Sequence, residues 1–307
     1  MTFSDNKQDK PDTQQYRQFV WPAIAAIEQK THAVPLSEAI RSDHATSEST
    51  RLNFPSVTLN FHPDQLCRGS SVVQGLLRDG VYQSQFESGI SNGSVSSHVG
   101  GQRWQWEQTI FEHAYDDAPA ALRPKYGALN FTGCEFGAAP RFGSAHLILK
   151  KHVLERCTFA YPDSHLNPKH FGTLKYMPLI PMAELNELGL EPLDSYIEAH
   201  VHGVVNLNLD VEAIVLDPSY RNTAVEAAAQ KMPMLLKWHS GYTLLGNSFA
   251  DCEQYRGRDV AELIQRIAVN NTLTPAIIGE YRGTGTNEQL LKKAWHCVAR
   301  FGGPHNA

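Results

Sequence analysis

Glu198, His200 and His202 are spaced two residues apart in the most strand-like stretch of the chain, YIEAHVHGVVNLNLDVEAIVLDPSY, residues 196–220. Successive side chains of a strand point to opposite faces, so these three project to one side and the apolar residues between them to the other. Two imidazoles and a carboxylate suit a transition metal, with His146 or His62 to complete the shell. A catalytic glutamate without a metal, or a solvated face without function, fits the same spacing.

The segment SQFESGISNG, residues 84–93, is rich in small hydrogen-bonding side chains and contains one aromatic residue. Such a loop suits a ligand that carries phosphate and a ring, because backbone N–H groups can approach it closely and an aromatic side chain can stack on it. A plain surface loop is the alternative. The chain has neither GxGxxG nor a Walker sequence. The candidate binding residues in this segment are Ser84, Gln85, Phe86, Ser88 and Asn92.

Three further side chains stand at positions where they can meet a ligand. His62 ends a predicted strand in NFHPD, where it either donates to a ligand hydroxyl or is structural. Tyr126 in KYGALN either stacks or fills the core, and Arg141 in APRFGS either pairs with a diphosphate or lies on the surface. No GxSxG sequence surrounds a serine, so the residues do not favour a hydrolase of the nucleophile-elbow type.

Strand and helix patterns alternate irregularly along the chain, which predicts an α+β fold. Residues 1–50 are expected to form a polar tail and a helical lead-in, and residues 51–245 a catalytic core. Residues 246–307 are expected to form a helical extension packed on that core. The pattern within the core predicts a helix over SSVVQGLLRDG, ended by Gly80, and a long strand or two successive strands over 196–220.

Composition narrows the class of partner. The formal net charge is −5 and the pI about 6.3, which gives no electrostatic reason to expect nucleic acid or an anionic membrane. The five cysteines include no CxxC, which indicates reduced thiols in a cytosol. The N-terminal residues have no apolar core, and no stretch approaches the ~20 apolar residues of a membrane span. A soluble protein without a classical signal peptide is expected.

The order of these pieces resembles the ADP-ribosyltransferase superfamily: a strand with His62, the helix SSVVQGLLRDG, then KYGALNF, SAHLILK and a strand that opens at Glu198. The resemblance implies split antiparallel sheets that hold NAD as co-substrate. It also implies that His62 grips the ribose on the nicotinamide side, Tyr126 flanks the nicotinamide, and Glu198 completes the catalytic triad. Arg141 and the 84–93 segment would then hold the diphosphate and the nicotinamide amide.

A second resemblance covers roughly residues 51–220 and rests on longer segments. The chain is similar to a bacterial family formerly of unknown function, connected with divergent ADP-ribosyltransferases, and to an effector of that activity that an intracellular bacterial pathogen injects into its host. This implies synthesis in a bacterial cytoplasm, translocation, and an arginine on a host enzyme as acceptor. Arginine-modifying members carry Glu or Gln two residues before the catalytic Glu, where this chain has Tyr196, so a carboxylate or another acceptor stays open. A non-catalytic module that binds NAD or protein is the remaining alternative. The matching segments are NFHPD, YQSQFESGISNG, GGQRWQWE, RPKYGALNF, PRFGSAHLILKKHVLERCTF and EAHVHG…DVEAIVLDPS.

Overall fold

The computed structural model of the chain describes residues 13–31, 55–89, 96–186 and 188–303. Nearly all of the predicted polar tail therefore lies outside the described residues. The helical lead-in is present as a π-helical turn, Tyr16–Val20, that continues into α1, Trp21–Lys30.

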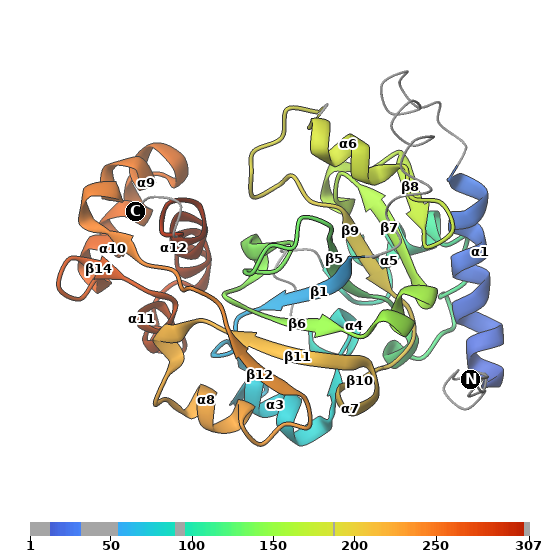
Figure 1. Cartoon of the computed structure of the whole chain (residues 1–307), viewed down its shortest axis with the longest axis horizontal. Coiled ribbons are helices and arrows are strands. Elements are labelled where there is room, and N and C mark those ends of the chain that lie inside the picture. Colours follow the sequence, from blue (N-terminus) through green and yellow to red (C-terminus); the bar gives the residue numbers. More distant parts are fainter. Residues whose placement is uncertain (1–12, 32–54, 90–95, 187, 304–307) are drawn as a thin grey trace, which may run out of the picture.

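Eight strands form the main sheet, in the order β12-β11-β6-β1-β5-β9-β7-β8 (Figure 1). Neighbouring strands are antiparallel except for β11 and β12, which pair in parallel. Helices surround the sheet, so the predicted α+β class with antiparallel strands is confirmed. The strands are β1 (Ser56–Phe61), β5 (Lys125–Asn130), β6 (Ala145–Leu149), β7 (Cys157–Tyr161), β8 (His170–Thr173), β9 (Glu198–Val201), β11 (Val211–Leu216) and β12 (Leu235–Trp238).

The two faces of this sheet differ in polarity because side chains alternate along each strand. One face carries apolar residues of β1, β6, β7 and β9, which form the largest core with three helices: α3 (Val72–Asp79), α6 (Leu179–Leu185) and α8 (Ala224–Ala229). The opposite face carries polar residues of these strands and of β5, including His62 just after β1, Tyr126 on β5 and Glu198 on β9. The period of two along each strand, together with the pairing registers, thus places all three predicted catalytic residues on one face.

The sheet is split at one end between β1 and β5. The two strands pair from Ser56 opposite Asn130 to Thr58 opposite Ala128, and the paired register stops there. Beyond this point β1 continues in register with β6, and β5 continues with β9. The strands stay in close contact at Gly127, where a Cβ atom would lie 2.4 Å from the carbonyl oxygen of Thr58. Hydrogen bonds join both halves into one sheet, and the divergence of β1 from β5 opens a gap between them.

The helix predicted over SSVVQGLLRDG is confirmed as α3. Ser71 caps it by accepting a hydrogen bond from the backbone N–H of Gln74, and Gly80 ends it with a left-handed backbone, φ 66°. The strand that follows is shorter than its sequence suggests: β4 covers Val81–Tyr82 and pairs with β10, Val205–Asn206.

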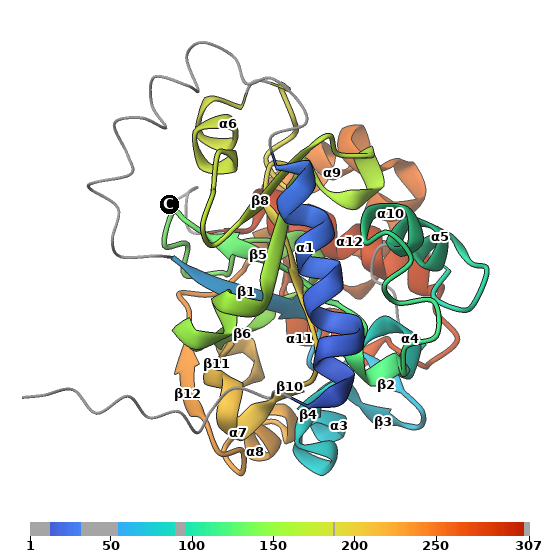
Figure 2. The same cartoon turned by 90° about the vertical axis from the view of Figure 1, so that its right-hand side faces the viewer.

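Two helical segments cover the polar face near β7 and β9. Helix α5 (Gln102–Ile110) and the turns after it pack with α1 in an apolar cluster that also includes Ala160 and Phe171. Helix α1 runs beside β8 at this side of the molecule (Figure 2). The polar residues of β7 and β9 beneath this cover are therefore shielded from water.

The C-terminal helices lie at the opposite end of the molecule from α1 (Figure 1) and have a core of their own. Trp295 on the last helix is fully buried, and its Nε1 donates to the carbonyl oxygens of Pro140 and Arg141 at 3.0 and 3.1 Å. This helix therefore contacts the loop before β6 directly. The segment contains α9 (Phe249–Arg256), α10 (Arg258–Ile267), α11 (Pro275–Glu280), α12 (Glu288–Phe301) and the strands β13 (Leu244–Leu245) and β14 (Thr272–Leu273).

The prediction of one long strand or two successive strands over 196–220 is wrong in part. The chain leaves β9 after Val201, forms the short β10, and makes a helical turn, α7 (Leu207–Asp210), before β11. Asn206 caps that turn by accepting hydrogen bonds from two backbone N–H groups. The alternation of polar and apolar residues resembles a strand, but the capping side chain competes with extended pairing. Among the described residues, no helix has the length and apolar character needed to cross a membrane.

Candidate active site

A cavity of about 410 Å³ occupies the split between β1 and β5. Its walls come from the ends of these strands, from β9, and from helices α3, α5 and α12. Six of the predicted residues line it, which brings together side chains from positions 62 to 198. These are His62, Gln85, Ser88, Tyr126, Arg141 and Glu198.

Glu198 is 5% exposed and opens β9 at the cavity wall. Its Oε1 accepts hydrogen bonds from the backbone N–H of Ser164 at 3.2 Å and from Nε2 of His200 at 3.1 Å. Its Oε2 accepts one from the Ser164 hydroxyl at 3.0 Å. The carboxylate is therefore fixed on one side by the protein, and Oε2 retains acceptor capacity for a ligand.

Glu198 is held in its ionised form despite its burial. Burial by itself raises the pKa of a carboxyl group, but the hydrogen bond from His200, the Arg103 guanidinium and the Ser164 hydroxyl together outweigh it. The pKa of Glu198 consequently lies below its ordinary value. A fixed negative charge at a cavity wall can stabilise positive charge that develops on a bound molecule.

Tyr126 is held by two residues of α5. Its hydroxyl donates to the Glu107 carboxylate at 2.8 Å, and the Arg103 guanidinium lies over its ring at 3.9 Å from the ring centre. Arg103 also donates from Nη1 to the Ser164 hydroxyl at 2.8 Å, which in turn contacts Glu198. Burial raises the pKa of Tyr126 well above its ordinary value, so its hydroxyl stays protonated. Arg103 therefore connects two of the three predicted catalytic residues.

His62 stands just after the end of β1, with the edge of its ring against Trp295 at 5.2 Å between ring centres. Burial, followed by the nearby charges of Arg282 and Lys292, lowers its pKa well below the ordinary value. His62 is thus a neutral imidazole at physiological pH, with one donor and one acceptor nitrogen.

Arg141 lines the cavity at the end closest to α12 and pairs with Asp194. Lys292 of α12 lines the same cavity. The C-terminal segment therefore contributes a wall residue of its own and, through Trp295, contacts both His62 and the backbone of Arg141.

The 84–93 segment differs in part from the predicted loop. Gln85–Ser88 form a helical turn, α4, capped by Ser84, whose hydroxyl donates to the carbonyl of Ala120 at 2.8 Å. Phe86 lies under the guanidinium of Arg123, 4.3 Å from the ring centre. Neither Ser84 nor Phe86 lines the cavity, and Asn92 lies outside the described residues. Their role in binding remains a prediction.

The residues of the metal hypothesis are buried, and their ring nitrogens have protein partners. His200 contacts Glu198 through Nε2 and Thr158 through Nδ1, and His202 contacts Thr158 through Nε2 and Tyr115 through Nδ1. Within the described part of the chain, no three His, Cys, Asp or Glu side chains are placed to hold one ion. His146 on β6 stands three strands from β9, about 14 Å away at the usual spacing. The hypothesis of a solvated face is wrong, because both rings are fully buried.

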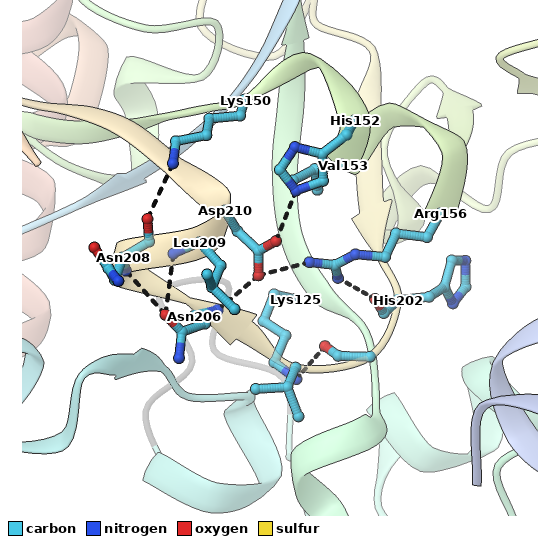
Figure 3. Close-up of polar contacts among 12 residues, drawn as sticks. Lys125, Lys150, His152, Val153, Arg156, His202, Asn206, Asn208, Leu209 and Asp210 are labelled. Atoms are coloured by element: carbon cyan, nitrogen blue, oxygen red, sulfur yellow. Dashed lines mark hydrogen bonds and ion pairs between the residues drawn. The ribbon is translucent and has the colours of Figure 1, made fainter. Parts of the chain in front are cut away.

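A second cluster of polar residues holds the segment that follows β9 in place (Figure 3). Arg156 donates to the carbonyl oxygen of His202 and pairs with Asp210 at 2.9 Å. Lys125 at the start of β5 donates to the carbonyl oxygens of Arg123 and Gly203 at 3.0 and 2.8 Å. Burial lowers the pKa of Lys125 to about 7. These contacts tie the start of β5 to the end of β9 and hold the two strands that carry Tyr126 and Glu198.

Sequence reasoning missed Arg103, Ser164, Lys292 and Trp295. Arg103 lies in GGQRWQWE, which carries the family resemblance but suggests no role for the residue. Ser164 and Lys292 lie far from the predicted site residues in sequence and in segments without a motif. Only the tertiary fold brings them to the cavity.

His296 next to Trp295 yields a prediction on stability. The residue is 4% exposed, and both of its ring nitrogens lack a hydrogen-bond partner. Burial, and then the charges of Arg256, Arg141 and Lys292, lower its pKa to about 3. The unfolded chain takes up this proton below pH ~6.5 and the folded chain does not, so the stability it contributes falls as pH drops from about 6.5 towards 3.

Replacing His296 by Leu should leave the unfolding temperature at pH 7 unchanged or higher, since two unpartnered buried nitrogens are removed. Between pH 6 and 4 the variant should lose about 1.4 kcal/mol less per pH unit than the wild type. Chemical denaturation across pH measures both quantities, with His98→Leu at an exposed position as control. Parallel stability curves for wild type and His296→Leu would contradict the burial argument.

No curated protein matches the chain. Among solved structures, the DarT protein of Thermus sp. 2.9 in complex with NAD+ is similar, at 11% sequence identity and a TM-score of 0.37. That match covers 62% of this chain and 98% of the other. A likeness this distant leaves the function to be argued from the cavity itself.

A family model described as "Protein of unknown function (DUF3626)" matches residues 56–191 and 181–301. These two matches span the sheet, the cavity walls and the C-terminal helices. The family thus includes the segment that supplies Lys292 and Trp295 to the site. The chain belongs to the DUF3626 family.

Proposed function

We propose that this protein consumes NAD and transfers its ADP-ribose to a protein side chain, with release of nicotinamide. The single observation that carries the proposal is the cavity in the split of the sheet, whose walls combine His62, Tyr126 and an ionised Glu198. Its volume falls in the range of small-molecule sites, roughly 300–1,000 Å³. Aromatic walls and guanidinium groups suit a dinucleotide, which offers rings and a diphosphate.

The chemistry assigned to each residue follows from its surroundings. Cleavage of the bond between ribose and nicotinamide develops positive charge on the sugar, as in glycoside cleavage generally. Glu198 faces this charge with a carboxylate that the protein has already oriented, so little reorganisation is needed. The neutral His62 can donate to a ribose hydroxyl, and Tyr126, held by Arg103 and Glu107, offers a ring face for the nicotinamide.

The acceptor we favour is an arginine of a host enzyme, reached after translocation of this protein. Asp163 lines the cavity next to Ser164 and Glu198, so a cationic side chain would enter an acidic environment. Tyr196, two residues before Glu198, donates its hydroxyl to Asp163. Arg141, with Lys292 at the α12 wall, is the candidate for the diphosphate.

The experiment uses the purified full-length protein, host-cell extract, and NAD labelled either on the adenylate phosphate or on the nicotinamide. We expect the first label on a protein and the second free in solution, with the modified side chain mapped by mass spectrometry. Retention of intact NAD without nicotinamide release would instead support a binding module. Stoichiometric zinc or iron whose removal abolishes the activity would favour the metal-dependent alternative.

A further inference from the structure

A continuous chain of hydrogen bonds runs from the candidate catalytic carboxylate into the interior. Glu198 contacts His200 at 3.1 Å, His200 contacts Thr158 at 2.9 Å, and Thr158 contacts His202 at 2.9 Å. His202 in turn contacts the hydroxyl of Tyr115 at 2.7 Å. Every member is at most 5% exposed. A network of buried polar side chains of this length costs free energy unless every donor and acceptor in it has a hydrogen-bond partner.

The sheet builds this chain from two strands. Thr158 on β7 is paired directly with His200 on β9, so their side chains share a face. His202 follows His200 by two residues, which places it diagonally from Thr158 within reach of the same hydroxyl. The fifth member, Tyr115, comes from the turns after α5, and its ring stacks on that of His202 with an interplanar angle of 7°.

Only one arrangement of protons satisfies every donor along this chain. Tyr115 O–H donates to Nδ1 of His202, whose Nε2–H donates to Thr158. The Thr158 O–H then donates to Nδ1 of His200, whose Nε2–H donates to Glu198. In the reverse arrangement the Tyr115 hydroxyl would have to donate to another acceptor. No other described residue accepts a hydrogen bond from it. All four donors therefore point towards the carboxylate.

We propose that Thr158, His200, His202 and Tyr115 are positioning residues that orient Glu198 and keep it ionised for the reaction. This inference rests on the proposed function of Glu198. The chain ends at Tyr115 beneath aromatic rings: Phe111 lies 5.6 Å from His200 and 5.1 Å from His202, between ring centres. Among the described residues, no polar group connects Tyr115 to solvent. The hydrogen-bond chain therefore fixes the direction of its hydrogen bonds and does not transfer protons to solvent.

Thr158 offers the sharpest test, since valine has nearly the same shape and lacks the hydroxyl. Thr158→Val removes both central hydrogen bonds, which frees the His200 ring to turn and lets the carboxylate move. Displacement of a catalytic group by about 1 Å costs up to ~100-fold in rate. We expect kcat for nicotinamide release to fall by about 10- to 100-fold with an unchanged KM for NAD, and Thr158→Ser to restore most of it.

Thr173→Val is the matched control, because Thr173 pairs with Thr158 on the next strand, is buried, and stands outside the chain. It should keep the wild-type kcat. Equal kcat values for Thr158→Val and the wild type would overturn the proposal. So would equal losses in the Thr158→Val, Thr158→Ser and Thr173→Val proteins, since these would reflect general disturbance of the strands.

A spectroscopic measurement separates failure of this inference from failure of the proposed function. Nitrogen-15 NMR of the imidazole rings, assigned with His200→Gln and His202→Gln, should show a proton on Nε2 and none on Nδ1 in both rings. The signals of both rings should change in Thr158→Val and recover in Thr158→Ser. A wild-type protein with this pattern but no NAD turnover would refute the proposed function alone. A proton on Nδ1 of either ring would refute the proposed hydrogen-bond chain, whether or not the protein turns over NAD.

Discussion

Replacing Glu198 by Gln should lower kcat for the proposed NAD cleavage by about 10²- to 10³-fold, the usual loss when one preorganised electrostatic group of an active site is removed. The amide keeps the shape of the carboxylate and one oxygen, which can still accept a hydrogen bond from the backbone N–H of Ser164. It lacks the negative charge that, in the proposed reaction, faces the developing ribosyl cation. The KM for NAD should change much less than kcat, because the charge acts mainly in the transition state. Initial rates of nicotinamide release measure both.

Glu212→Gln provides the control for this substitution. Glu212 is an exposed carboxylate on β11 that pairs with Lys237, so its loss should leave the rate unchanged. The unfolding temperature of Glu198→Gln must stay close to that of the wild type for the comparison to hold. A folded Glu198→Gln protein that cleaves NAD at the wild-type rate would end the assignment of Glu198.

Replacing Arg123 by Met lowers the free energy of unfolding by about 3–5 kcal/mol, the loss typical of breaking a buried ion pair from one side. Arg123 and Glu107 are 4% and 0% exposed and are joined at 2.7 Å. Arg123 also donates to the carbonyl oxygen of Tyr115 at 2.6 Å. Without the guanidinium, the charge on Glu107 stays buried with the Tyr126 hydroxyl as its remaining hydrogen-bond partner among the described residues and the Arg103 charge nearby. Denaturant unfolding measures the loss.

The double variant Arg123→Met with Glu107→Gln should recover more than half of this stability, because the uncompensated charge is removed and the amide still accepts the Tyr126 hydroxyl. Burial raises the pKa of Glu107, and Arg123 opposes that rise. In Arg123→Met the pKa therefore rises further, so the difference from the wild type should shrink as pH falls and Glu107 takes up a proton. Arg258→Met, which breaks an exposed pair with Glu262, should cost at most about 1 kcal/mol. A similarly small loss of unfolding free energy for Arg123→Met would show that the buried pair stabilises the fold no more than an exposed pair does.

Sequence periodicity predicts the structure of some segments around the site correctly and of others incorrectly. Alternation along β9 predicts that Glu198 and His200 share a face, and the caps of α3 predict its limits to within a residue. These properties depend on neighbouring residues, and local backbone geometry is enough to set them. The same local rule fails after Val201, where Asn206 caps a helical turn that mimics a strand in its polarity pattern.

The sequence by itself determined the α+β class, the strands at or next to which His62, Tyr126 and Glu198 lie, and the face that Glu198 shares with His200 and His202. Only the tertiary structure decided that β1 and β5 part after Thr58 and Ala128 to open the cavity, and that Arg103, Ser164 and Lys292 reach it. It also decided that the imidazoles beside Glu198 are buried and hydrogen-bonded. The reason is physical: strand period and caps follow from local backbone geometry, whereas burial and charge pairing depend on packing between segments distant in the chain.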